Sequence, residues 1–104
     1  MLVLKIDILK YISDDQPGFA EARFKDAWDK EFIVHDKVPI FTKEYLDSNS
    51  KYPQPGIIAC LKIKEFVDKD GRRIITINTE KPWAVETIDG IYQFDILPNQ
   101  LTEI

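Results

Sequence analysis

The chain has 104 residues, of which 44% are hydrophobic and 31% are charged; this size fits one domain with its own core. Eighteen acidic and 14 basic residues give a net charge of -4, and no basic block is present, so no nucleic-acid partner is expected. The apolar runs are too short for a signal peptide or a spanning helix, so no membrane partner is expected either. Because Cys60 is the single cysteine, no internal disulfide can form, which favours a cytoplasmic location.

The N-terminal part of the chain alternates apolar and polar side chains in three short segments, residues 2–12, 19–27 and 31–41. This alternation predicts half-buried antiparallel strands. The apolar phase shifts by one residue at Leu9, which predicts a bulge or a sharp bend there. The third segment places Phe32 and Val34 on the inward face and ends where Pro39 removes a ladder donor.

The middle of the chain carries turn signals. Thr42 is expected to cap a short helical turn over residues 42–48. The run YPQPG, from Tyr52 to Gly56, combines two prolines with a glycine, and these residues favour a corner where the chain changes direction. The alternative is a recognition surface in which Tyr52 is exposed beside other aromatic side chains.

Segments 57–67 and 72–80 flank the turn sequence DKDG and predict a hairpin. A three-residue loop places Phe66 opposite Ile74 and so pairs apolar with apolar residues, whereas a four-residue loop pairs apolar with charged ones. The three-residue loop requires Gly71 to adopt a left-handed conformation.

A second hairpin is predicted where segments 84–88 and 91–96 flank Asp89 and Gly90, with a two-residue turn that sets Thr87 opposite Tyr92. In total we expect a single all-β domain over residues 1–104, with six or seven antiparallel strands and one short helical turn. Short antiparallel strands with little helix usually close into a small barrel, because closure removes the exposed edges.

Few residues suggest chemistry. His35, the only histidine, would make a general base with Asp36, but neighbouring strand residues point to opposite faces, so we interpret it as a surface residue. Zinc needs about three or four His or Cys ligands, and His35 with Cys60 is too few. Cys60 has no activating neighbour and is interpreted as a small apolar residue. No catalytic residue, metal or cofactor is predicted.

The two tryptophans lie at strand ends, Trp28 in DAWDK and Trp83 in EKPWAVE. Each either plugs an end of the barrel or anchors an interface with another protein. Trp28 stands between two aspartates and is expected to be partly exposed, with His35 and Lys37 as a polar rim around its ring. The candidate binding residues are Trp28, His35, Lys37, Tyr52 and Trp83.

The order of the segments GFAEARFKDAWDKEFIVHDKVPIFT, YPQPGIIACLKI and TINTEKPWAVETIDGIYQFDI resembles an uncharacterised family of small, stand-alone bacterial β proteins over nearly the whole chain. In strand order the chain is also similar to the β-barrel domains of elongation factor Tu-type proteins. The resemblance implies a small bacterial β-barrel protein, and it implies no activity and no site residues.

Three classes of function follow as alternatives. The first is a non-enzymatic cytoplasmic protein that binds another protein, in concrete form an acidic inhibitor of the immunity-protein kind. The second is an oligonucleotide-binding barrel, which would use Lys62, Lys64, Phe66, Arg72 and Arg73. The third is a small hydrolase or isomerase using His35. The composition favours the first, with a protein partner and no cofactor.

Overall fold

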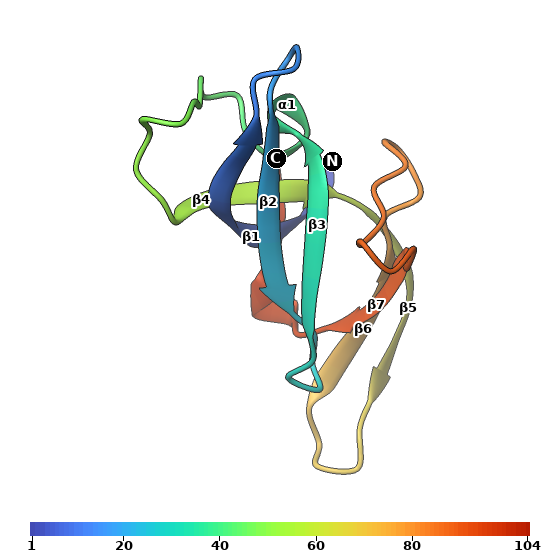
Figure 1. The fold of residues 1–104 in the computed structure, drawn as a ribbon. Helices are drawn as coiled ribbons and strands as arrows, with labels where there is room; N and C mark the ends of the chain where they lie inside the picture. Colours follow the sequence, from blue (N-terminus) through green and yellow to red (C-terminus); the bar gives the residue numbers. More distant parts are fainter.

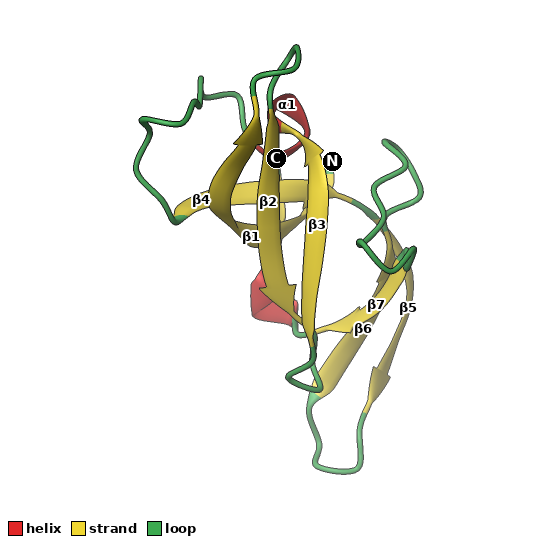
Figure 2. Ribbon diagram, viewed as in Figure 1, coloured by secondary structure: helices red, strands yellow, loops and turns green.

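The computed structural model describes residues 1–104, and half of them lie in strands, which confirms the all-β prediction (Figure 2). Eight strands are present where six or seven were expected. They are β1 (Leu2–Ser13), β2 (Phe19–Lys25), β3 (Glu31–Lys37), β4 (Gln54–Ala59), β5 (Leu61–Val67), β6 (Arg73–Asn78), β7 (Gln93–Ile96) and β8 (Leu101–Glu103). The helical pieces are α1 (Val38–Phe41) and a 3-10 turn, η1 (Pro98–Gln100). No helix has the length and apolar character needed to cross a membrane.

The strands form two open antiparallel sheets (Figure 1). The large sheet has the order β3-β2-β1-β4, with β8 also paired to β1, and the small sheet has the order β5-β6-β7. β4 continues through Cys60 into β5, so one run of chain passes from the large sheet to the small one.

The closed barrel that was expected is not formed by strand pairing, since β3 and β7 share no ladder. On that side the sheets are bridged by isolated backbone bonds, from Ala27 N to Asp95 O (2.7 Å) and from Ile88 N to Ile33 O (2.9 Å). β7 has only four residues, and residues 79–92 before it form loops and turns rather than a strand. The strand that would close the barrel is therefore missing.

β1 organises the large sheet because it bends and changes partners along its length. Residues 7–13 pair with β2, residues 3–8 pair with β4, and residues 2–4 pair with β8. The register with β2 shifts between Ile8 and Lys10, which confirms the irregularity predicted at Leu9.

The core lies between the two sheets. Phe24 and Phe32 stack at a centroid distance of 5.4 Å, and both meet Phe94 edge-on at 5.0 and 4.9 Å. Ile75 and Ile77 of β6 belong to the same buried cluster. The inward faces of β2 and β3 thus pack against the small sheet, as the alternation of their side chains predicts.

The short helix is not where it was expected. Residues 42–48 form an irregular loop, whereas the helical turn is α1, which buries Val38 and Phe41. Pro39 lies in the first turn of α1, where its missing N–H breaks no helical bond and its fixed φ suits the helix. Pro39 therefore starts a helix as well as ending the strand before it.

The first hairpin has the predicted loop, with Phe66 opposite Ile74 and Gly71 at a φ of +83°. The register then shifts between Lys62 and Lys64, a bulge that the sequence did not indicate. It leaves Ile63 out of the ladder.

The second hairpin differs from the prediction. Thr87 N donates to Ile91 O (3.0 Å) and Gly90 N to Thr87 O (2.9 Å), so the loop has three residues and Thr87 does not face Tyr92. Gly90 has a φ of +78° and takes the same place in its loop as Gly71 does in the first. The expectation of a two-residue turn was wrong, because only one residue of this loop, the glycine, adopts a positive φ.

Candidate functional site

Trp28 lies in the β2–β3 turn and is 49% exposed. Its indole nitrogen donates to an Asp95 carboxylate oxygen (3.3 Å), and the Arg72 guanidinium lies 5.4 Å from the ring centroid. The ring thus joins a turn of the large sheet to β7 and to the β5–β6 hairpin. The ring is half-exposed, as predicted. It contacts residues of both sheets and does not fill one end of a barrel.

His35 and Lys37 do not form a rim around Trp28. Lys37 pairs with Phe19 at the far end of β3, and even Glu31 to His35 spans about 13 Å at the usual rise of a strand. His35 Nε2 lies 2.9 Å from a Glu21 carboxylate oxygen on the adjacent strand, a cross-strand pair on the outer face. The prediction was wrong because it assumed that both residues lie near the turn that precedes β3. It neglected how far along the strand they are from that turn.

Tyr52 is half-buried and packs against the core. Its hydroxyl donates to Asp47 O (2.8 Å), and burial raises the pKa of this phenol. Tyr52 therefore anchors the loop over residues 42–53 and does not belong to an exposed aromatic surface, which agrees with the corner interpretation.

The YPQPG run forms the corner at its start, and from Gln54 onward it belongs to strand β4. Pro55 and Gly56 lie inside β4, and a β-carbon at Gly56 would come within 2.9 Å of side-chain carbons of Ile6 and Ile8. Glycine is needed here because two isoleucines of β1 cover this part of β4.

Trp83 lines a groove that no other tryptophan or tyrosine reaches. The indole is 40% exposed and lies with Lys37, Pro17, Pro39 and Ile40 around one small hollow, which opens beside a larger one of about 710 Å³. The structure therefore brings two of the predicted residues together, Trp83 and Lys37, whereas Trp28, His35 and Tyr52 line neither hollow.

We call the larger hollow the Trp83 groove. It runs between α1 and β4, an edge strand with no strand on its second side. Its apolar lining includes Pro39, Ile40, Phe41, Pro55, Ile57 and Trp83, and its charged side chains are Lys5, Asp7, Lys43 and Glu44. Sequence reasoning missed the contribution of α1, because that helical turn was expected a few residues later.

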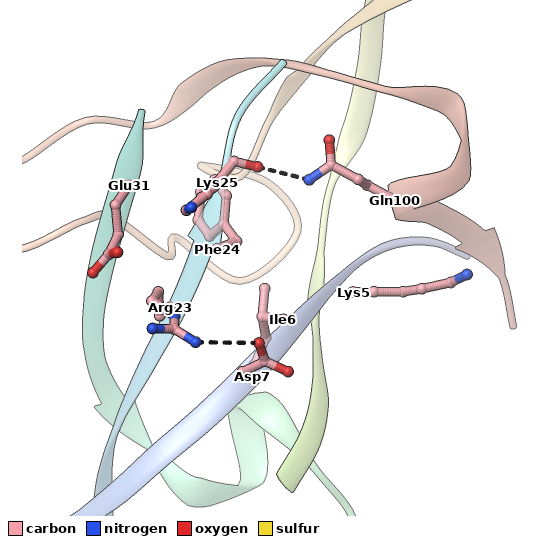
Figure 3. Close-up of a pocket in the computed structure, with 8 residues that line it drawn as sticks. All are labelled: Lys5, Ile6, Asp7, Arg23, Phe24, Lys25, Glu31 and Gln100. Atoms are coloured by element: carbon pink, nitrogen blue, oxygen red, sulfur yellow. Dashed lines mark hydrogen bonds and ion pairs between the residues drawn. The ribbon is translucent and has the colours of Figure 1, made fainter. Parts of the chain in front are cut away.

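A second hollow of about 390 Å³ is polar and lies beside β1 and β2 (Figure 3). Arg23 is held by Asp7 at 3.8 Å, and Gln100 donates its amide to Lys25 O at 2.7 Å. Figure 3 shows Lys5 directed away from Arg23, and its amine donates to Asn99 O. This hollow does not gather free cations, so it is a weaker candidate than the Trp83 groove.

The basic residues proposed for an oligonucleotide site are largely engaged by acids. Glu65 binds Arg73 and Lys62, each at 2.8 Å, and the hydrogen bonds from Arg73 and Lys62 lower the pKa of its carboxyl to about 2. Arg72 is held by Asp68 at 2.9 Å. Cations held in this way are less available to phosphates, which disfavours the oligonucleotide alternative.

Two further observations concern chemistry. Cys60 is buried, and burial raises the pKa of its thiol to about 11, which keeps the unreactive neutral form dominant. No group of three or more His, Cys, Asp or Glu side chains is placed to hold a metal ion.

Comparison of the chain with protein families, curated proteins and solved structures finds no match. The resemblance to small bacterial β proteins stays a prediction.

Proposed function

We propose that this chain is a non-enzymatic binding protein and that it holds an extended apolar segment of another protein in the Trp83 groove. The observation that carries the proposal is the half-exposed indole of Trp83 beside the free edge of β4. Tryptophan is among the residues that most often carry the binding energy of an interface.

The shape of the groove suits a short stretch of extended chain. Its volume of about 710 Å³ lies within the usual range of binding hollows. A free strand edge along one wall is the feature used when peptides dock as an added strand. Pro55 removes one donor from this edge, so we expect apolar contacts with Ile40, Ile57 and Trp83 to supply most of the affinity.

The concrete form of the proposal is a small acidic inhibitor of the immunity-protein kind, acting in the cytoplasm. The net charge of -4 favours a partner with a basic surface around the docked segment, since complementary fields speed association and suppress wrong partners. Lys43, a basic residue that lines the groove, marks where an acidic group of the partner would sit.

Site-specific photocrosslinking in the native host tests the proposal. A photoreactive amino acid is placed at position 83 and, as a matched control, at position 28, since both indoles are about half-exposed and they lie at different ends of β3. We expect one discrete protein adduct from position 83 and none from position 28. Equal adducts from both positions, or none from position 83, would contradict the proposal.

The protein in that adduct is then purified and its affinity measured. Trp83→Ala is expected to weaken binding about 30-fold or more, which corresponds to about 2 kcal/mol. Trp28→Ala is expected to change the affinity less than about threefold. Equal losses for both variants would mean that the partner does not use the Trp83 groove.

A further inference from the structure

β5 differs from the other strands longer than three residues because its side chains are exposed on both faces along its whole length. All its residues are exposed except Phe66, which is half-buried. Its three aliphatic side chains, Leu61, Ile63 and Val67, keep between 49% and 65% of their surface in solvent. Large aliphatic side chains gathered in this way on one strand usually mark a contact surface.

β5 is also an unpaired sheet edge. It pairs with β6 on one side and with no strand on the other, and Figure 1 shows the β5–β6 hairpin projecting away from the large sheet. A free edge presents a row of backbone donors and acceptors that fits another strand.

The bulge in β5 sets which residues direct their backbone groups outward. Asp68 N donates to Arg72 O (3.0 Å), and hydrogen bonding alternates along an antiparallel strand, so Val67 and Glu65 direct their groups away from β6. Lys62, Glu65 and Val67 lie opposite alternate residues of β6 (Ile77, Ile75 and Arg73). Because of the bulge, Lys62 directs its backbone N–H and C=O away from β6, as Glu65 does.

We propose that two copies of this chain associate through antiparallel pairing of their β5 edges, with Lys62 of each copy opposite Glu65 of the other. In this register both residues direct backbone groups into the seam, so each pair is hydrogen-bonded and opposite in charge. Two-fold symmetry repeats the pair. The same register sets Leu61 opposite Phe66 of the second copy, apolar against apolar. The small sheets then form one six-stranded sheet.

The charge distribution favours a second copy of this chain as the partner of the β5 edge. Residues 61–73 carry five basic and three acidic side chains, and the rest of the chain carries nine basic and fifteen acidic ones. Antiparallel pairing runs each hairpin tip back toward the body of the other copy. A hairpin of net charge +2 then lies beside a body of net charge -6 in both halves of the dimer.

Lysines and bulges commonly protect free edges from pairing, and β5 has both. Lys62 is held by Glu65 at 2.8 Å within its own chain, so pairing exchanges one ion pair for another. Lys64 lies near the symmetry axis, where its amine, 5.7 Å from the Phe66 ring centroid, faces its counterpart. This repulsion makes the dimer weak, and Lys64→Ser is expected to tighten it about threefold.

Sedimentation of the full chain over a wide concentration range tests the proposal. Lys62→Glu and Glu65→Lys are each expected to weaken self-association more than about tenfold, because two attractive pairs become repulsive. An equimolar mixture of the two variants is expected to recover association, since each pair across the seam is then opposite in charge. Asp70→Lys, which changes a charge at the hairpin tip outside the seam, is the matched control. It makes the hairpin more basic beside the acidic body of the other copy, so it should not weaken association.

A chain that stays monomeric at all concentrations, or a mixture that does not recover, would overturn the proposal. Hydrogen exchange of the wild-type protein provides a second test that does not depend on whether the variants fold. The amides of Lys62 and Glu65 should become more protected as the protein concentration rises, while exposed amides in the Trp83 groove should not. Concentration-independent exchange at both seam amides would overturn the proposal equally. The dimer does not depend on the function proposed for the Trp83 groove.

Discussion

β2 and β5 are both seven-residue strands with alternating sequences, FAEARFK and LKIKEFV, yet their environments differ. β2 lies between β1 and β3 and turns Ala20, Ala22 and Phe24 into the core. β5 has one neighbour and is exposed on both faces. The comparison teaches that alternation establishes a strand, whereas the neighbours of the strand decide whether its apolar face is covered.

The sharpest test of this comparison is a matched pair of truncations. Phe24→Ala is expected to lower the free energy of unfolding by about 3–5 kcal/mol, because it opens a cavity beside Phe32 and Phe94. Phe66→Ala in β5 is expected to cost about 1–2 kcal/mol, since that ring is only half-buried. Urea denaturation measures both. Equal costs would show that β5 is as well packed as β2.

A backbone test compares glycines in the two sheets. Gly56→Ala is expected to destabilise the large sheet by about 2–3 kcal/mol, because the added carbon meets Ile6 and Ile8 at 2.9 Å. The melting temperature measures the loss. Gly56→Ala combined with Ile8→Val relieves part of the crowding, so a double variant no more stable than Gly56→Ala would contradict this explanation.

Trp28 connects the two regions, and its removal should loosen their junction. Trp28→Ala is expected to cost about 2 kcal/mol, from part of the burial of the ring and the hydrogen bond to Asp95. Thermal unfolding measures the loss. Trp28→Phe keeps the ring contact with Arg72 but not the hydrogen bond, and it should fall between the wild type and Trp28→Ala.

Gly71 tests the hairpin that carries β5. Its φ is +83° and the space beside it is open, so Gly71→Ala is expected to cost about 1 kcal/mol from backbone strain alone. Gly71→Asn should cost less, because asparagine tolerates the left-handed region. A melting temperature that Gly71→Ala leaves unchanged would contradict the assigned loop.

The smallest effect concerns Glu65. Arg73 and Lys62 lower the pKa of this carboxyl from 4.5 to about 2, so its contribution to stability is present above pH 4.5 and is lost as the pH falls toward 2. Because the group is open to solvent, the contribution is small. Melting temperatures of Glu65→Gln and wild type should converge toward pH 2, and a gap that widens there would contradict the assignment.

Local signals in the sequence were sufficient for several features. The all-β class follows from short alternating segments, the irregularity at Leu9 from a phase shift, and the DKDG loop from the pairing of Phe66 with Ile74. The half-exposure of Trp28 follows from its polar turn. Each of these depends on residues close together in the chain or on one pair of strands.

The features that only the tertiary structure decided depend on distant segments. The barrel stays open because β7 is short and residues 79–92 do not continue it as a strand, although their sequence alternates like the others. The Trp83 groove joins α1, β4 and a loop that lie far apart in the chain, and β5 is exposed because nothing packs on its outer side. Whether a strand is buried depends on the segments that pack against it in space. The sequence of the strand alone does not specify those segments.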